Sequence, residues 1–239
     1  MPELPSFEID GVTFVLDVTW GVARGRSTAE QFFLIKTPVF VDYYKSLRDR
    51  RPRAILEIGM FDGGSMVLLD KLYQPAVLVG VDICDELPAL EVYRRSRPHI
   101  RTLYRTSQDD PGLPDRLRQH FPNGIDLIVD DASHHYNRTR KTFQHLFPLL
   151  RPGGLYVIED WQWAHQEPYQ SPENGWYGDP ALTNLLFDLI VNLPIDPRLA
   201  LLTIRHDLAA IEKSTSAGTG PIDLDDGRQH LRGRSLSLL

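Results

Sequence analysis

Residues 57–65 read Glu-Ile-Gly-Met-Phe-Asp-Gly-Gly-Ser, and this stretch decides the fold. It follows an apolar run over 54–58 that has the length of a buried strand, and it leads into a helical pattern over 64–73. Gly59 and Gly63 permit the sharp turn that a strand needs in order to pass into a helix. The stretch therefore predicts the first strand–turn–helix unit of a parallel α/β sheet.

The same alternation of strands and helices continues along the chain. A helix over 181–193 and two closing strands over 199–205 and 208–212 are expected after it. Strands that are apolar throughout and separated by helices indicate a mostly parallel, Rossmann-like sheet with helices on both faces. The earlier elements are strands over 77–82, 100–104, 125–130 and 154–159, and helices over 87–95, 113–121 and 134–150.

The two ends of the chain depart from this alternation. Asp10-Gly11 favours a hairpin over 7–16, and helices are expected from Ser27 or Thr28 to about Lys36 and over 39–47. The tail from Ser214 is rich in Ser, Gly, Asp and Arg, which predicts a flexible tail or a subunit contact. The predicted organisation is an N-terminal hairpin with helices that forms an acceptor entrance or lid (1–50), a catalytic domain (51–213) and the tail (214–239).

Composition restricts the class of protein. The 239 residues suffice for one α/β domain, and 42% hydrophobic and 24% charged residues are ordinary for a globular chain. A net charge of −6 argues against a nucleic-acid partner. No apolar run has the length of a membrane span, and the N-terminus does not resemble a secretory signal. The single cysteine, Cys84, cannot form an internal disulfide, so we expect a cytoplasmic location.

The turn at residues 57–65 also indicates which cofactor it holds. Its glycines read G-x-x-x-G-G, whereas a dinucleotide fingerprint reads G-x-G-x-x-G. Glu57 precedes Gly59 by two positions, and its carboxylate would repel a pyrophosphate but can accept hydrogen bonds from an ammonium group. S-adenosylmethionine carries such a group and no phosphate, so it is the predicted cofactor. The alternative is a glycine turn that merely packs a helix on a strand.

Polar residues after the next strands extend this candidate cofactor site. Asp82 ends the second strand, where an acidic residue can bind two ribose hydroxyls. Ser107 and Gln108 follow the third strand and suit the edge of an adenine. Phe61 either walls the pocket or belongs to the core. The remaining candidate cofactor residues are Gly63, Ser65 and Asp130.

Two acidic pairs end the fourth and fifth strands. Asp130-Asp131 and Glu159-Asp160 would converge on one crevice, because neighbouring parallel strands end at the same edge. Carboxylates brought together repel each other unless a cation joins them, and Mg²⁺ prefers oxygen ligands. The candidate metal ligands are Asp131, Glu159 and Asp160. The alternative is that the first pair caps the following helix and the second lies in an ordinary loop.

A histidine beside these acids suggests how a hydroxyl is activated. A sugar hydroxyl is a poor nucleophile until its pKa is lowered or its proton is removed, and a metal and a histidine can do these two things. His134 is the preferred base because it follows Asp131 by three residues, and His135 is the reserve.

An aromatic stretch over 161–179 follows the second acidic pair. It is long for a loop, as functional lids often are. Trp161, Trp163 and His165 are the candidate acceptor-binding residues, since aromatic faces stack on sugars and flat rings; packing of the loop or a subunit contact is the alternative. Weaker candidates for the entrance are Trp20, Arg24 and Arg26.

A longer motif carries a resemblance to a known family. Residues 125–135 read IDLIVDDASHH, residues 147–154 read FPLLRPGG, and Glu159-Asp160 follow. The stretch from residue 55 to 161 resembles class I S-adenosylmethionine-dependent methyltransferases of the macrocin O-methyltransferase and cephalosporin-hydroxylase-like group, which includes metal-dependent sugar O-methyltransferases. This resemblance implies a seven-stranded, mostly parallel sheet with the last strand inserted antiparallel.

The resemblance also implies roles for individual residues. The metal ligands fall on Asp131, Glu159 and Asp160, the catalytic histidine on His134, and the cofactor residues on Glu57, Gly59, Asp82 and Gln108. Ala132 and Met60-Phe61 depart from the family pattern. The implied acceptor is a glycoside or oligosaccharide, with a mannoside as one candidate because mycobacterial enzymes that methylate mannose polysaccharides look similar; a homodimer is also implied. A catechol-type or phenol methyltransferase and a non-catalytic cofactor-binding subunit remain the alternatives.

Overall fold

The computed structural model describes residues 4–19, 25–215, 220, 222–225, 232–234 and 238 of the chain. Trp20 and Arg24 lie outside the described residues. Within the described part, no helix is long and apolar enough to cross a membrane. The chain divides into two compact units, Met1–Ser107 and Gln108–Leu239. The predicted domain borders lie elsewhere, after residues 50 and 213. These domain borders stay a prediction.

The first unit begins with a three-stranded sheet in the order β1-β2-β3. The antiparallel strands β1 (Ser6–Ile9) and β2 (Val12–Leu16) form the predicted hairpin. Asp10 and Gly11 both have positive φ, 46° and 76°, as a tight primed turn requires. The third strand, β3 (Gln31–Leu34), lies parallel to β2.

The strand β3 corrects the sequence prediction of a helix from Ser27 or Thr28 to about Lys36. Phe32 and Leu34 are 0% and 2% exposed while their neighbours face outward, so this segment has the period of a strand. Thr28 does not cap a helix; its Oγ1 accepts the backbone N–H of Gln31 at 3.1 Å in a turn that leads into the strand. Pairing with β2 outweighs the helical pattern, because the aromatic side chains then fill the core.

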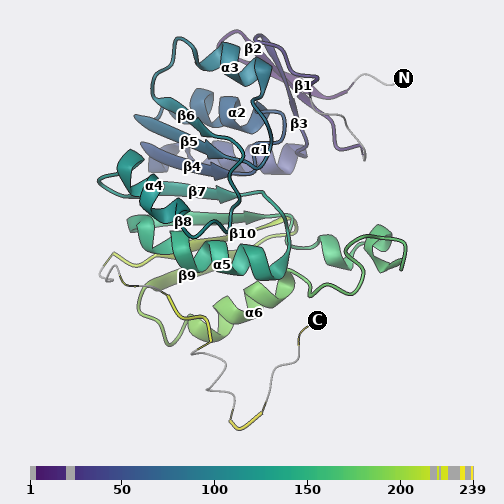
Figure 1. The fold of residues 1–239 in the computed structure, drawn as a ribbon, viewed down its shortest axis with the longest axis vertical. Coiled ribbons are helices and arrows are strands. Elements are labelled where there is room, and N and C mark those ends of the chain that lie inside the picture. The colour runs from purple at the N-terminus through teal and green to yellow at the C-terminus, as the bar shows by residue number, and fades with distance from the viewer. Residues whose placement is uncertain are drawn as a thin grey trace. The chain divides into compact units, whose positions relative to one another are not determined.

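The rest of the first unit builds one half of the predicted sheet. The strands lie parallel in the order β6-β5-β4. The helix α2 contacts both β3 and β5 and therefore lies between the two sheets (Figure 1). The bounds are α1 (Pro38–Ser46), η1 (Leu47–Arg50), β4 (Ala54–Ile58), α2 (Gly64–Tyr73), β5 (Val77–Val81), α3 (Pro88–Arg94) and β6 (Ile100–Leu103).

The second unit holds the other half of the sheet. The strand β7 runs parallel to β8, and β10 is antiparallel to both β8 and β9, between which it lies. The helices α5 and α6 contact each other and lie on one face of these strands (Figure 1). The bounds are α4 (Leu113–His120), β7 (Ile125–Asp130), α5 (Tyr136–Leu146), η2 (Phe147–Leu149), β8 (Leu150–Glu159), η3 (Trp163–His165), η4 (Glu167–Gln170), α6 (Thr183–Asn192), β9 (Leu199–Ile204) and β10 (Leu208–Lys213).

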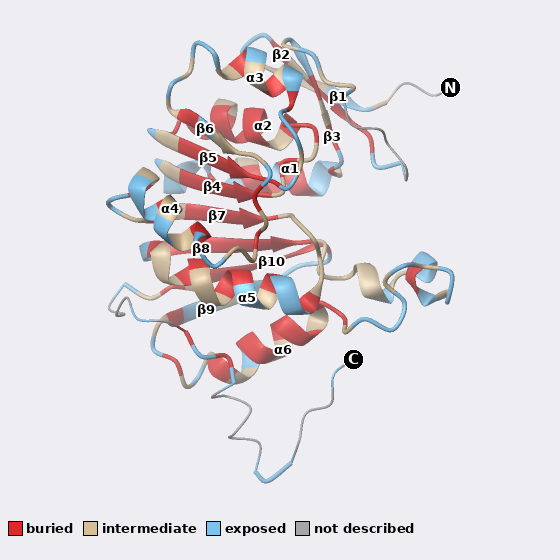
Figure 2. Cartoon of the chain, in the orientation of Figure 1, coloured by how far each residue is buried: buried red, intermediate tan, exposed pale blue. Residues whose placement is uncertain are grey.

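The strand order confirms the predicted fold class. It reads β6-β5-β4-β7-β8-β10-β9, mostly parallel, with the final strand of the sequence inserted antiparallel. The central strands β4, β5, β7 and β8 are buried along most of their length (Figure 2). One helix is shorter than expected: the pattern over 134–150 gives α5 only to Leu146, because Pro148 forces a 3₁₀ turn.

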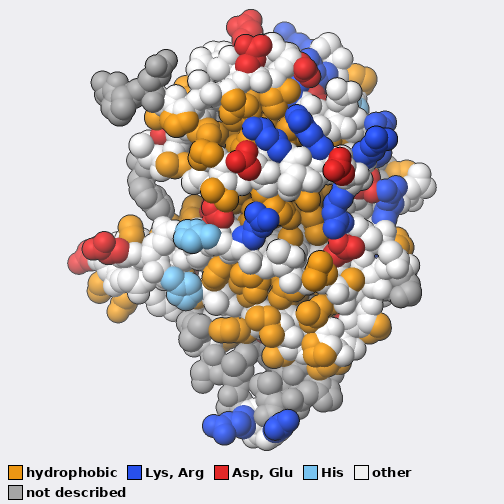
Figure 3. All heavy atoms as spheres, turned by 180° about the vertical axis from the view of Figure 1, so that it is seen from behind, with side chains coloured by type: hydrophobic (Ala, Val, Ile, Leu, Met, Phe, Trp, Pro, Cys, Tyr) orange, Lys and Arg blue, Asp and Glu red, His pale blue; other side chains and the backbone are white. Residues whose placement is uncertain are grey.

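The edge strand β9 exposes apolar side chains. Leu201 and Ile204 on this strand are 53% and 44% exposed. The view from behind shows further hydrophobic side chains on the face of the second unit that α5 and α6 leave open (Figure 3). An edge strand without charged residues offers its unpaired backbone groups to another chain.

Candidate active site

The turn at residues 57–65 has the backbone that its sequence predicts. Glu57 at the end of β4 is 0% exposed. Gly59 and Gly63 have φ of 88° and 83°, a region that side chains other than glycine rarely adopt. At Gly63 an added Cβ would also lie 2.9 Å from Leu90 Cβ. Phe61 has φ of 48° without being a glycine, which stores strain at the tip of the turn.

Gly64, at the start of α2, serves packing. A Cβ on Gly64 would lie 2.3 Å from the carbonyl oxygen of Phe33, so this glycine lets α2 approach β3. The packing alternative therefore holds for Gly64, and the cofactor role of the turn stays a prediction. Gly64 packs a helix on a strand, while Gly59 and Gly63 form a left-handed turn at a strand end. Ser65 follows in the first turn of α2 and is half-buried.

Asp82 fixes this turn from the neighbouring strand end. Its Oδ2 accepts the backbone N–H groups of Met60 and Phe61 at 2.7 and 3.1 Å, and its Oδ1 accepts that of Cys84 at 2.9 Å. The side chain is 7% exposed. Asp82 therefore holds the backbone of the turn in place, and its contact with ribose stays a prediction.

Asp62 also has a structural role, which the sequence analysis missed. Its Oδ1 accepts the N–H of Gly25, and its Oδ2 accepts the N–H and hydroxyl of Ser27 at 2.8 and 2.6 Å. The Asp62 carboxylate therefore connects the segment before β3 to the turn at residues 57–65. Arg26, between these two partners, pairs with Asp17 at 2.5 Å. No local pattern reveals such contacts, because the partners lie 35 and 37 residues apart.

Gln108 is the first residue of the second unit, and both the nitrogen and the oxygen of its side-chain amide form hydrogen bonds. Its Nε2 donates to Thr142 Oγ1 at 3.0 Å, and its Oε1 accepts the backbone N–H of Ser133 at 3.1 Å. The side chain thereby ties the loop before α5 to that helix. Its contact with adenine, like that of Ser107 in the first unit, stays a prediction.

Three side chains of the predicted metal and base site lie together. One donor atom each from Asp131, His134 and Asp160 lies within 4.8 Å of the others. His134 Nε2 is 3.7 Å from Asp131 Oδ1, and these side chains are 10% and 22% exposed. Two ligands on opposite sides of a divalent cation lie roughly 4–5 Å apart. The cluster therefore has the spacing and the oxygen donors that such an ion requires.

The backbone at this cluster is strained. His134 and Asp160 have φ of 54° and 56°, in the left-handed region. The N–H of Asp160 donates to the carbonyl of Asp207 at 2.8 Å, which helps to hold this conformation. Strain of this kind persists where the surrounding structure enforces it, and it concentrates at functional sites.

Asp130 and Glu159 lie deeper than the cluster. They are 2% and 1% exposed at the ends of β7 and β8. Burial raises the pKa of Asp130 to about 7; the hydrogen bond from Tyr156, at 2.7 Å, opposes this, and the charges of Asp131 and Glu159 add to it. Glu159 is not among the three residues whose donor atoms lie together. Its role as a ligand and the cofactor role of Asp130 stay predictions.

The two neighbouring histidines face different partners. His134 lies against the acids, and the ring of Trp163 covers it at a centroid distance of 4.2 Å. His135 Nδ1 pairs with Asp179 Oδ2 at 3.2 Å, and its ring meets the edge of Trp176. His134 therefore lies beside the acids, whereas His135 fastens the aromatic loop to the start of α5. The role of either histidine as a base stays a prediction.

The aromatic loop forms one wall of a cavity of about 720 Å³. Trp163, Tyr169 and Trp176 stack on one another with centroid distances of 5.3 to 5.9 Å. Trp161 Nε1 donates to the Arg205 carbonyl at 3.0 Å, and His165 Nε2 lies 2.5 Å from Thr183 Oγ1. All three predicted acceptor residues line the cavity together with His134, His135 and Asp160. The sequence analysis missed Asp179, Ala181 and Leu182, which also line it.

Comparison with known proteins confirms the resemblance. Residues 56–161 match a protein family described as a methyltransferase domain.

Several similar curated proteins are named as O-methyltransferases. The chain is 28% identical to the 8-demethyl-8-alpha-L-rhamnosyl tetracenomycin-C 2'-O-methyltransferase of Streptomyces olivaceus, over 78% of this chain and 52% of the relative. It is 30% identical to the mycinamicin VI 2''-O-methyltransferase of Micromonospora griseorubida, over 74% of this chain and 47% of the relative. The chain thus spans about half the length of the curated relatives it matches.

Solved structures share the fold. The MycE methyltransferase from the mycinamycin biosynthetic pathway, in complex with Mg, SAH and mycinamycin VI, matches with a TM-score of 0.58 and 29% identity over 78% of this chain and 52% of its own. The O-methyltransferase TomG from Streptomyces achromogenes matches with a TM-score of 0.56 and 16% identity over 76% of this chain and 82% of its own. The second likeness shows the fold alone.

Proposed function

We propose that this protein transfers the methyl group of S-adenosylmethionine to a hydroxyl of a sugar, with Mg²⁺ or another divalent cation bound beside the acceptor. One observation carries this proposal. The donor atoms of Asp131, His134 and Asp160 lie within 4.8 Å of one another, and His134 and Asp160 line a large aromatic cavity. A cation site, a base and an acceptor pocket therefore adjoin within the second unit.

The first unit supplies the cofactor residues of this proposal. Glu57 is fully buried at the end of β4. Its carboxylate can accept hydrogen bonds from the ammonium group of S-adenosylmethionine. Gly59 and Gly63 leave their left-handed turn without side chains, and Asp82 holds the turn in shape. Phe61, Ser65 and Ser107 are further proposed cofactor residues of the first unit. Gln108 and Asp130 are proposed cofactor residues of the second unit.

Asp131 and Asp160 would hold the cation, with Glu159 as the third proposed ligand. When bound, S-adenosylmethionine supplies an activated methyl group, and the cation lowers the pKa of a coordinated hydroxyl. His134, whose Nε2 lies 3.7 Å from Asp131 Oδ1, would accept the proton of the acceptor hydroxyl. The Trp163 ring lies against the His134 ring, with a centroid distance of 4.2 Å, and so limits the access of water to it.

The cavity favours a glycoside over a free monosaccharide. Its volume of about 720 Å³ lies in the range that takes a molecule of drug size. The lining combines the polar groups of His134, His135 and Asp160 with the aromatic rings of the loop. Several similar proteins are named as methyltransferases of sugars on larger molecules, which supports the same class of acceptor here. An oligosaccharide, including a mannoside, is a member of this class.

A phenolic acceptor is the second candidate. The observation that favours it is the stack of Trp163, Tyr169 and Trp176, because a flat ring can extend such a stack. A catechol-type acceptor would use the same acids, His134 and cation. A non-catalytic cofactor-binding subunit has less support, because it would require neither His134 nor the acids beside it.

We also propose that the protein is a cytoplasmic homodimer. The exposed apolar side chains of Leu201 and Ile204 on the edge strand β9 support a subunit contact. Analytical ultracentrifugation of the full chain and of Leu201→Glu tests this: the variant should sediment as a monomer. A wild type that sediments as a monomer at micromolar concentration contradicts the dimer.

An acceptor screen tests the proposed activity. Mono- and disaccharides, aryl glycosides and simple phenols are each offered with S-adenosylmethionine, with and without Mg²⁺, and the release of S-adenosylhomocysteine is followed. We expect Mg²⁺-dependent turnover with glycosides. Turnover with phenols alone would select the second candidate, and binding of the cofactor without turnover of any acceptor would support the non-catalytic subunit.

A further inference from the structure

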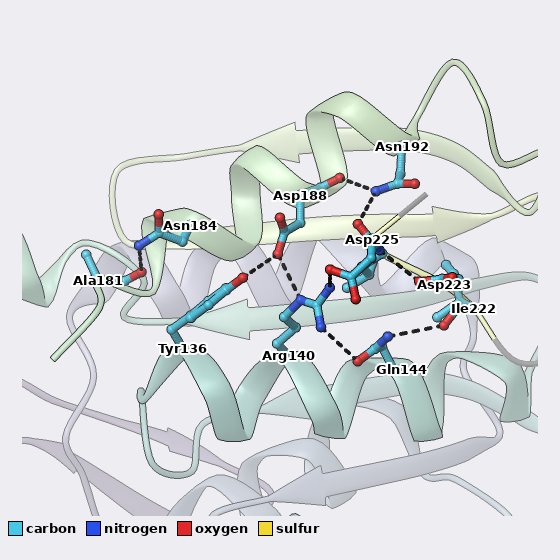
Figure 4. A network of polar contacts seen from close by, with 11 residues as sticks. Tyr136, Arg140, Gln144, Ala181, Asn184, Asp188, Asn192, Ile222, Asp223 and Asp225 are labelled. Carbon is cyan, nitrogen blue, oxygen red and sulfur yellow. Dashed lines mark hydrogen bonds and ion pairs between the residues drawn. The ribbon is translucent and has the colours of Figure 1, made fainter. Parts of the chain in front are cut away.

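Residues 222–225, here named the C-terminal strap, are packed against the second unit. Ile222 and Leu224 are 4% and 0% exposed. Gln144 Nε2 donates to the carbonyl of Ile222 at 3.4 Å, and Asn192 Nδ2 donates to that of Leu224 at 2.9 Å. The strap is therefore bonded to both α5 and α6, from which these two side chains come (Figure 4).

A buried carboxylate links the strap to the first turn of α5. Asp188 on α6 is 0% exposed, and its Oδ2 accepts hydrogen bonds from Tyr136 Oη at 2.8 Å and Arg140 Nε at 3.0 Å. Arg140 Nη2 also binds Asp225 Oδ1 of the strap at 2.6 Å. Figure 4 shows the guanidinium of Arg140 between the two carboxylates. A buried charge is costly unless it is paired and hydrogen-bonded, so these side chains hold each other in one arrangement.

Asp188 joins α5 to α6, and the N-terminal ends of these two helices border the acceptor cavity. Tyr136 is the first residue of α5 and follows His134 and His135, which both line the cavity. Leu182 lines the cavity directly before α6 begins at Thr183. Any shift of α5 against α6 would therefore move His134 relative to Leu182 in the cavity lining.

We propose that the C-terminal strap is a working part of the acceptor site, because it positions His134 through Arg140 and Asp188. Tyr136, Arg140 and Asp188 are positioning residues: they touch neither the acceptor nor the cation, but they fix the turn that carries the base. The identity of the reaction rests on the proposed function, whereas the mechanical link between strap and α5 does not.

Arg140→Lys tests the effect on catalysis in the full chain. A lysine keeps the positive charge, but its single ammonium lacks the planar fork that binds Asp188 and Asp225 together. We expect kcat to fall about 5- to 20-fold, less than the roughly 100-fold loss that a misplacement of about 1 Å can cause. The dissociation constant of S-adenosylmethionine should not change.

Arg116→Lys is the matched control, since Arg116 pairs with Asp110 at 2.6 Å away from the cavity. This control should keep the kcat of the wild type. Arg140→Lys with a lower melting temperature but an unchanged kcat would overturn the proposal, because the residues would then serve stability alone.

Hydrogen exchange of Asp225→Asn tests the mechanical link without any reaction. Asp225 is 65% exposed at its side chain, so the variant should fold. We expect faster amide exchange both in residues 222–225 and in residues 134–140, and no change at either place in the control Asp110→Asn. Faster exchange in the strap alone would overturn the link. A wild type without methyl transfer would defeat the proposed function, while the exchange experiment would still decide the link.

Discussion

Asp160→Asn separates the catalytic role of the acidic cluster from its effect on stability. The substitution removes one negative charge and almost no volume. Asparagine also tolerates the left-handed backbone that Asp160 adopts, with φ of 56°, so the strain at this position does not change. The variant therefore reports on the charge of Asp160 alone.

The magnitude follows from the spacing of the cluster. Donor atoms of Asp131 and Asp160 lie within 4.8 Å, and two like charges at that separation repel by about 3.5 kcal/mol at an effective dielectric constant of roughly 20. Asp131 is 22% exposed at its side chain, so solvent screening reduces this to about 1 kcal/mol. Without metal, Asp160→Asn should unfold about 2–4 °C higher than the wild type.

The assay is thermal unfolding in EDTA and in a Mg²⁺ titration, combined with turnover. Wild type should gain stability with Mg²⁺, whereas Asp160→Asn should need at least roughly 100-fold more Mg²⁺ and lose turnover. Asp115→Asn is the control, because Asp115 lies in an exposed ion pair with Arg118 and should keep the response to Mg²⁺. A variant that melts below the wild type in EDTA and still responds to the same Mg²⁺ concentrations would refute the reasoning.

Other substitutions test the remaining parts of the site. His134→Asn should lower kcat by roughly 10²–10⁴ while the Mg²⁺ midpoint in thermal unfolding stays the same; a shifted midpoint would make this histidine a ligand. His135→Asn should keep most of the turnover, and a dead variant would exchange the roles of the two histidines. Glu57→Gln should weaken binding of S-adenosylmethionine by roughly 10- to 100-fold in calorimetry, because it loses a charge-assisted bond to the ammonium group; unchanged affinity would remove Glu57 from the cofactor site. Gly63→Ala should destabilise the fold by about 1–2 kcal/mol in urea unfolding, since its φ of 83° and the nearby Leu90 both oppose a Cβ, and an unchanged midpoint would show that the turn relaxes freely.

Most strands could be predicted because their signal is local. The apolar runs that give β4 and β7 coincide with the expected residues, since a strand buried on both faces needs an unbroken apolar sequence. The segment at β3 was misread as a helix because its conformation is set by pairing with β2, a partner about 18 residues away. Local periodicity does not report such pairing.

The acidic cluster could be predicted because its residues follow strand ends, and part of the cavity lining because aromatic residues crowd the loop over 161–179. Asp131 and Asp160 were found this way, because neighbouring parallel strands bring their ends together. The partners that hold the site were missed, because they come from distant segments. Asp179 pairs with His135, and Asp188 accepts a hydrogen bond from Tyr136. Their roles depend on how a loop and a helix pack on the sheet, which no short motif records.

Transfer of an isotope-labelled methyl group tests the central claim most directly. The full chain is incubated with methyl-labelled S-adenosylmethionine and the best glycoside of the screen, with Mg²⁺ or after exhaustive chelation, and the label is located by mass spectrometry. We predict that the label appears on one hydroxyl oxygen of the sugar with Mg²⁺, and that chelation abolishes the transfer. Transfer that proceeds equally after chelation, or label that appears on an atom other than a hydroxyl oxygen, would contradict a metal-assisted O-methyltransferase built on Asp131, His134 and Asp160.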